Sequence, residues 1–226
     1  MKIRPVIERI PVLGLADYVL LPYTVTALHV FEPQAVDMVD DCQATDRLLV
    51  IANLAPEWFD VPSGLPAVRD IAGLGKVVNV QVLEDGTREV FLHGVARVRI
   101  ARIIQERPQR LARVERDDDD PSTVGERFRQ RGMMRRITGF LTSLAVSDPV
   151  HSDLLRIAHS AEDPAILSFR LAAALLRAPA ERQRALECTS PAARLALLID
   201  ALAARLMDTH DRHGGIATDT HSHTVH

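Results

Sequence analysis

Residues 20–33 read LLPYTVTALHVFEP, a stretch that carries a proline near its start and another at its end. The β-branched residues between Thr24 and Phe31 favour a strand. Alternation along this strand places apolar side chains on both faces, which predicts a central strand of a sheet. Pro33 then opens a helix, because the backbone N–H that proline lacks has no partner at a helix start. The stretch therefore predicts a strand that leads directly into a short helix.

Further strand signals follow along the first half of the chain. Residues 10–13 form an apolar segment that includes Pro11. Residues 47–53 form a continuous apolar run, which is typical of a buried strand. Asp85-Gly86 lies between two β-like runs and predicts a tight hairpin, because glycine accepts the positive φ of such turns. We therefore expect a β-rich first half.

The apolar period becomes helical after Pro121. A capping residue stands before proline at Asp163 and Ser190, and Thr123 with Glu126 predicts a capping box at the first helix. The apolar stripe of that helix is predicted to include Val124, Phe128, Ile137 and Leu141. We expect the helices to pack on one another, and a groove for a partner is the alternative.

An acidic run, Asp117–Asp120, separates the two halves and is predicted to be a solvated linker because it carries like charges only. The tail from His210 to His226 is polar and rich in histidine, and we expect it to be disordered. The predicted organisation is a β domain at 1–116, an acidic linker at 117–121, a helical subdomain at 122–208 and a tail at 209–226.

Composition limits the environment of the protein. The formal net charge of −3 over 226 residues predicts no strong general attraction for nucleic acid. Cys42 and Cys188, the two cysteines, are far apart in the chain and predict free thiols in a reducing compartment. No apolar run approaches the ~20 residues that cross a bilayer. We therefore predict a cytoplasmic protein with no membrane partner.

Catalytic patterns are missing from the sequence. Gly73-Leu74-Gly75-Lys76 precedes a valine and a strand-like run, whereas a phosphate loop needs Ser or Thr at the start of a helix. His151, Ser152 and Asp153 are neighbours on a predicted helix and point in different directions, so they cannot form a triad. We predict no enzyme activity, no cofactor and no metal site.

Arginines recur along the last predicted strands, and Arg97, Arg99 and Arg102 form a candidate basic strip for RNA or for an acidic partner. No aromatic residues are interleaved with them to stack on bases. A solvated outer face of a strand is the favoured interpretation.

Several ordered motifs resemble the amino-terminal substrate-binding domain of Lon proteases. They are Leu28-His29-Val30-Phe31-Glu32-Pro33, Asp46-Arg47-Leu48-Leu49, Gly75 to Val80, Leu83 to Thr87 and Gly94 to Ile100. The resemblance covers roughly residues 8–207. It implies an α+β fold: a PUA-like β-barrel with one or two short helices, followed by an all-α helical bundle extension. One departure is Pro22-Tyr23, where many members have a Pro-Gly pair.

The resemblance ends before the ATPase and peptidase domains of those proteases, which implies a stand-alone, non-enzymatic protein that recognises unfolded or extended polypeptide segments. Strand addition or apolar pockets are the expected modes of binding. The candidate contacts are turn and loop residues: Tyr23, Trp58, Phe59 and Leu65. Trp58 and Phe59 have an alternative role, which is to plug their loop onto the barrel. Further candidate partners are a protease or chaperone acting in trans and a second copy of the chain in a homo-oligomer. The alternative functions are a PUA-like RNA-binding module and a protein-interaction adaptor.

Overall fold

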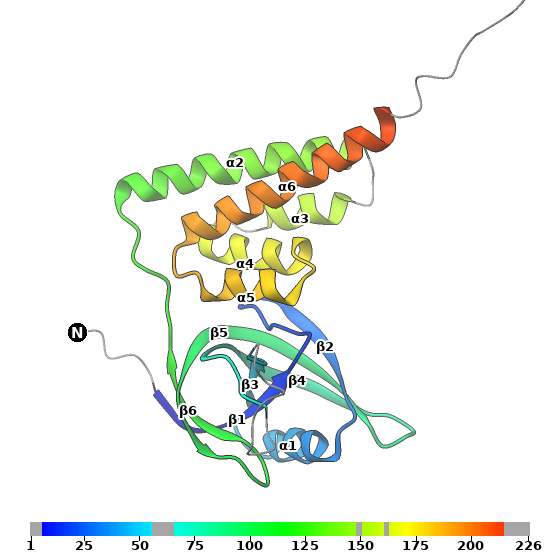
Figure 1. Cartoon of the computed structure of the whole chain (residues 1–226), viewed down its shortest axis with the longest axis vertical. Helices are drawn as coiled ribbons and strands as arrows, with labels where there is room; N and C mark the ends of the chain where they lie inside the picture. Colours follow the sequence, from blue (N-terminus) through cyan, green and yellow to red (C-terminus); the bar gives the residue numbers. More distant parts are fainter. Residues whose placement is uncertain (1–5, 56–65, 148–150, 161–162, 215–226) are drawn as a thin grey trace, which may run out of the picture.

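A ring of β-strands lies at one end of the molecule and a layer of helices at the other (Figure 1). The computed structural model describes residues 6–55, 66–147, 151–160 and 163–214. The ring contains β1 (Val6–Leu15), β2 (Val25–Val30), α1 (Pro33–Gln43), β3 (Leu48–Asn53), β4 (Ile71–Val82), β5 (Arg88–Gln105) and β6 (Leu111–Arg116). The helical region contains α2 (Val124–Ser147), α3 (Ser152–His159), α4 (Pro164–Leu175), α5 (Pro179–Glu187) and α6 (Pro191–Gly214). The predicted β-rich first half and helical second half are confirmed.

The length of β5 closes the ring. The strand order is β2-β5-β4-β3-β1-β6, and β5 also pairs with β6. Residues 88–93 of β5 pair with β2, and residues 98–105 pair with β6 on the same edge. β1 and β3 are parallel, whereas the other strand pairs of the sheet are antiparallel. One 18-residue strand thus joins both ends of the sheet.

β2 is an edge strand, and the prediction of a central strand was wrong. It pairs only with β5 among the described strands. Val25 is 72% exposed and Phe31, just after the strand, is 65% exposed. Apolar side chains on both faces of a strand do not show that both faces are covered, because coverage depends on distant parts of the chain.

Two glycines let the segment before β2 cross the ring in backbone contact. A Cβ on Gly73 would lie 2.1 Å from the carbonyl oxygen of Leu20, and one on Gly94 would lie 2.1 Å from the carbonyl oxygen of Leu21. No side chain fits in that space, so both positions require glycine. Leu21 is buried in the same apolar cluster as the helices.

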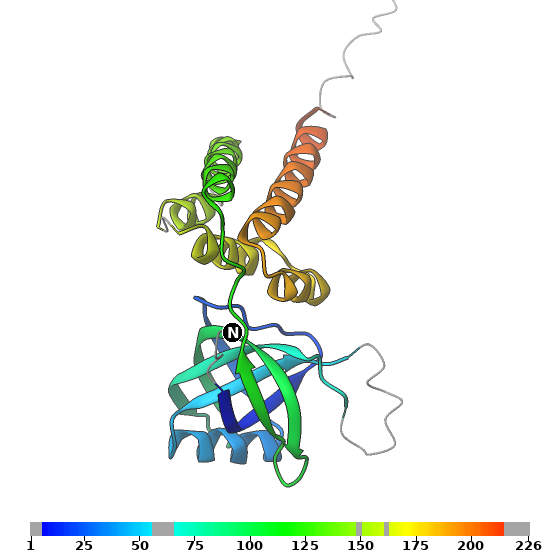
Figure 2. The same ribbon diagram turned by 90° about the vertical axis from the view of Figure 1, so that its left-hand side faces the viewer.

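The helical region packs on the ring and shares a core with it. Ile71 of β4 and Val19 and Leu21, from the segment that crosses the ring before β2, belong to the apolar cluster formed by α2–α6. Two further clusters lie within the ring and beneath α1, which covers the end of the ring away from the helices (Figure 2). The ring and the helical region are therefore joined by apolar packing as well as by the chain.

Local predictions of caps and turns are confirmed. The Asp163 carboxylate accepts hydrogen bonds from the N–H groups of residues 165 and 166. Thr123 and Glu126 form the predicted capping box, with bonds of 2.7 and 3.2 Å. Gly86 has a φ of +83° in the hairpin turn. Each of these features depends on residues only a few positions apart.

Two predictions for the long helices were wrong. Val124 and Phe128 are 76% and 78% exposed and do not belong to the buried stripe of α2, which begins further along the helix. The backbone of α6 continues to Gly214, beyond the predicted start of the tail at residue 209. No proline or glycine interrupts the chain between Leu206 and Gly214, so the helix can continue. None of the described helices is long and apolar enough to cross a membrane.

Candidate functional site

A hollow of about 370 Å³ lies beside the second half of β1, between α1 and the turn that joins β5 to β6. We call it the β1 groove. Residues 12–16 form one side of it, and Ala35 and Met38 of α1 lie on another. The remaining lining residues are Glu32, Gln34, Leu54, Pro66, Glu106, Pro108, Gln109 and Arg110. A smaller hollow of about 280 Å³ shares Leu13, Leu15 and Ala16 with it.

The backbone of β1 presents an open edge to this groove. The N–H of Val12 donates to the carbonyl of Arg110 at 2.9 Å, while the carbonyl of Leu15 accepts from the N–H of Leu54 at 3.1 Å on the opposite side. Alternate residues of a strand face the same neighbour, so Gly14 faces the same side as Val12. Pairing with β6 stops at Pro11. Among the described residues, no backbone group is paired with Gly14 on that side.

Arg110 holds the β5–β6 turn in a position that leaves this edge open. Its Nε donates to Glu106 at 2.9 Å, and its Nη2 donates to the carbonyl of Pro66 at 2.8 Å. Only 8% of Arg110 is exposed, so these partners are needed to offset the free-energy cost of burying its charge. β6 begins at Leu111, so the strand does not extend along Gly14.

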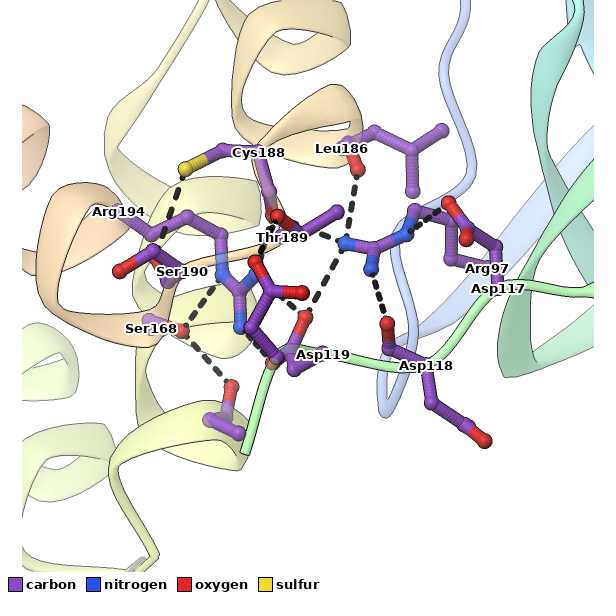
Figure 3. Close-up of polar contacts among 12 residues, drawn as sticks. Arg97, Asp117, Asp118, Asp119, Ser168, Leu186, Cys188, Thr189, Ser190 and Arg194 are labelled. Atoms are coloured by element: carbon purple, nitrogen blue, oxygen red, sulfur yellow. Dashed lines mark hydrogen bonds and ion pairs between the residues drawn. The ribbon is translucent and has the colours of Figure 1, made fainter. Parts of the chain in front are cut away.

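A separate cluster of buried charges joins the ring to the helical region (Figure 3). Arg97 of β5 is 3% exposed, and Arg194 of α6 is fully buried. Arg97 donates to Asp117 and Asp119 at 3.1 Å each, and also to the carbonyls of residues 118, 186 and 188. Arg194 donates to Asp119 at 2.8 Å, to Ser168 at 3.0 Å and to the carbonyl of residue 188.

Asp119 therefore bridges the two arginines, and a buried charge is tolerated only with such partners. The guanidinium carbon of Arg194 also lies 3.9 Å from the centre of the Phe169 ring, which adds a cation–π contact. Asp117 is 4% exposed, so the acidic run that we predicted to be solvated is partly buried as the counter-charge of two arginines. The like charges in the sequence gave no sign of this, because their partners lie far away along the chain.

Tyr23 lies at this junction and not in the β1 groove. Its ring centre is 6.3 Å from that of Phe169, and its carbonyl accepts a hydrogen bond from Arg170 at 3.3 Å. Its φ is +63°, a conformation that glycine adopts freely and that costs other residues energy. The Pro-Gly pair expected from the resemblance suits this turn for that reason.

The other predicted contacts divide into two groups. Trp58, Phe59 and Leu65 lie outside the described residues, although Leu54 and Pro66, on either side of them, both line the β1 groove. Of the predicted basic strip, Arg97 is buried, whereas Arg99 and Arg102 are exposed. These three arginines therefore do not form one surface.

The β1 groove was not predicted from the sequence. Whether the edge of a strand is open depends on where the neighbouring strand begins to pair with it, and here that strand is β6, far away in the chain. Within the described ranges, no group of three or more His, Cys, Asp or Glu side chains is placed to hold a metal ion. The groove offers backbone polar groups and apolar walls, which suit binding of an extended chain.

Together these features define a two-part protein in which a strand ring carries a groove and a helical region is fastened to the ring. Comparison with known proteins identifies the family. The chain belongs to the family described as the ATP-dependent protease La (LON) substrate-binding domain, whose model matches residues 9–204. The predicted resemblance is thereby confirmed.

Among relatives, the chain is 26% identical over 206 residues to Lon protease of Heliobacterium modesticaldum, with 91% of this chain and 25% of that protein covered. It is 24% identical over 197 residues to Lon protease of Escherichia coli K12, with 87% and 25% covered. The chain thus spans about a quarter of the length of these curated relatives.

Two solved structures have the same fold. The amino-terminal domain of Mycobacterium avium complex Lon protease superposes with a TM-score of 0.67 at 18% identity, covering 87% of this chain and 98% of that one. The Lon amino-terminal domain protein from Xanthomonas campestris gives 0.57 at 23% identity, covering 86% and 98%.

Proposed function

We propose that this chain recognises exposed, extended polypeptide segments without catalysing a reaction on them, and that such a segment adds to the open edge of β1. The observation that carries the proposal is the side of Gly14 within the β1 groove on which, among the described residues, no backbone group is paired. The description of its family as a substrate-binding domain supports the same function.

Strand addition suits a protein that accepts many sequences. Every extended segment offers the same backbone N–H and C=O groups, so main-chain hydrogen bonds provide affinity without selecting a sequence. Side chains of the added strand alternate between its two faces. One face of the added strand meets the apolar residues Leu13, Leu15 and Met38, which favours segments with apolar side chains at alternate positions.

Trp58, Phe59 and Leu65 belong to this proposal as contacts for the segment, because the residues that flank them line the groove. Tyr23 was predicted as a contact as well, but its position at the junction favours a role in holding the turn. Transfer of the bound segment to a protease or chaperone is also part of the proposal, since the relatives are named Lon proteases.

Blocking the groove tests the proposal. Ala16 is exposed and lines both hollows beside β1, so Ala16→Trp fills the groove without changing the core. Ala101, exposed on β5 and outside the groove, gives the matched control Ala101→Trp. The probe is a fluorescein-labelled ten-residue peptide of alternating valine and threonine, with its binding followed by fluorescence anisotropy. We expect Ala16→Trp to abolish binding and Ala101→Trp to leave it unchanged.

Peptide chemistry separates strand addition from binding through side chains alone. Methylation of alternate backbone nitrogens removes the donors on one edge of the peptide and keeps every side chain. We expect binding to be lost when the methylated edge is the one that faces β1, and retained for the other set. If both methylated peptides bind as well as the parent, strand addition is refuted.

A further inference from the structure

Carboxylates surround the end of the β1 groove that lies against α1. A hollow of about 380 Å³ runs along α1, shares Gln34, Pro108 and Gln109 with the groove, and is lined by Asp37, Asp40 and Asp41. Glu32 and Glu106 line the groove itself. We call these five carboxylates, which adjoin the apolar groove, the acidic flank.

Only part of this charge is neutralised within the protein. Arg88 pairs with Asp40 at 2.8 Å, and Arg110 pairs with Glu106 at 2.9 Å. Asp41 accepts a hydrogen bond from the neutral side chain of Gln109 at 2.6 Å. The hydrogen bond to Asp40 raises the pKa of Arg88, and the nearby charge of Asp37 contributes to the same shift. Among the described residues, Glu32, Asp37 and Asp41 form no ion pair, so the flank has an excess of negative charge.

The stability of α1 does not explain this arrangement. Asp40 and Asp41 lie in the last turn of the helix, where the negative end of the helix dipole disfavours carboxylates, and no basic residue occupies that turn. Each of these charges adds to a negative potential that extends over the groove, with a range of about 8 Å at physiological salt. A ligand of opposite charge would relieve this repulsion.

We propose that the β1 groove prefers extended segments in which a lysine or arginine lies next to the apolar residues. This inference rests on the proposed function, because it assigns a charge preference to the same site. Apolar side chains of the segment pack beside Gly14, and the basic side chain reaches the carboxylates of Asp37 and Asp41.

The experiment compares two labelled peptides that share the valine–threonine core. One carries two lysines at each end and the other carries two glutamates, and both are titrated by fluorescence anisotropy at low salt. The protein variant combines Asp37→Lys with Asp41→Asn, in which the asparagine keeps an acceptor for Gln109. Its matched control combines Asp153→Lys with Asp200→Asn, the same charge change at exposed positions of α3 and α6.

We expect the lysine peptide to bind wild-type protein about three- to tenfold more tightly than the glutamate peptide, a size typical of exposed ion pairs. This difference should disappear in the flank variant, persist in the control variant and shrink at high salt. A difference that survives in the flank variant would overturn the assignment to Asp37 and Asp41.

Failure of this inference is distinguishable from failure of the proposed function. Equal affinity for both peptides, each still blocked by Ala16→Trp, refutes the charge preference and leaves the peptide groove standing. If neither peptide binds, or if Ala16→Trp does not affect the binding of the peptides, the peptide groove and the charge preference are both refuted.

Discussion

Asp119 is the carboxylate on which the two buried arginines of the junction converge, and we expect Asp119→Asn to destabilise the protein strongly. Arg194 is fully buried and Arg97 is 3% exposed, so neither cation can turn to water when its counter-charge is removed. Asparagine keeps the size of aspartate and one carbonyl acceptor, but it presents an NH₂ group to the guanidinium that faced the second oxygen.

The magnitude follows from the cost of leaving a buried charge without its partner, which is about 3–5 kcal/mol. Arg97 retains Asp117 at 3.1 Å, and Arg194 retains Ser168 at 3.0 Å, so the lower end of that range applies. For a chain of this size, each kcal/mol corresponds to about 2–4 °C. We therefore expect a loss of about 3 kcal/mol and a decrease in Tm of about 6–12 °C.

The assay is urea denaturation followed by circular dichroism, with thermal unfolding as a second measurement. Asp118→Asn is the matched control, since the Asp118 carboxylate pairs only with Arg116 among the described residues and both side chains are about half exposed (51% and 48%). An exposed pair of this kind contributes at most about 1 kcal/mol. Equal losses for Asp118→Asn and Asp119→Asn would refute the reasoning.

Three further outcomes are expected. Burial raises the pKa of the Cys42 thiol to about 11, so at pH 8 it should stay protonated and resist iodoacetamide while the more exposed Cys188 reacts; equal labelling rates by mass spectrometry would contradict this. Asp163→Ala removes the cap of α4 and should cost about 1 kcal/mol in urea denaturation, whereas Asp153→Ala, at an exposed site, should change stability by less than about 0.5 kcal/mol. Tyr23→Gly should be about 1 kcal/mol more stable than Tyr23→Ala, because only glycine relieves the positive φ; the opposite order would show that this turn is not strained.

Local features were predictable from the sequence because the interactions that produce them are short. The Asp163 cap involves residues two and three positions away, and the N–H of Gly86 donates to the carbonyl of Leu83 within a turn of four consecutive residues. The edge position of β2 was not predictable in this way. Its apolar residues resemble those of a covered strand, and only the tertiary structure shows that β2 ends the strand order and that Val25 is exposed.

The candidate site was predicted less well than the fold. The resemblance implied polypeptide binding, and strand addition was one of the expected modes. The position of the open edge was not predicted, because it depends on where β6, which is far from β1 in sequence, begins to pair with β1. The turn before β6 is in turn joined to Pro66 by Arg110, across 44 positions of sequence. The acidic flank likewise combines α1 with a turn that lies far from it in sequence, as the Asp41–Gln109 hydrogen bond shows.

The sequence by itself determined the type and order of the elements, the proline-led and capped helix starts, and the family to which the chain belongs. Only the tertiary structure decided which charges are buried and which strand edge stays open. Caps, turns and periodicity involve neighbours within one turn of helix or one hairpin. By contrast, Arg97 meets the carbonyl of Leu186 across 89 positions of sequence, and Asp119 meets Arg194 across 75. Partners at such separations are brought together only when the ring closes and the helices pack on it.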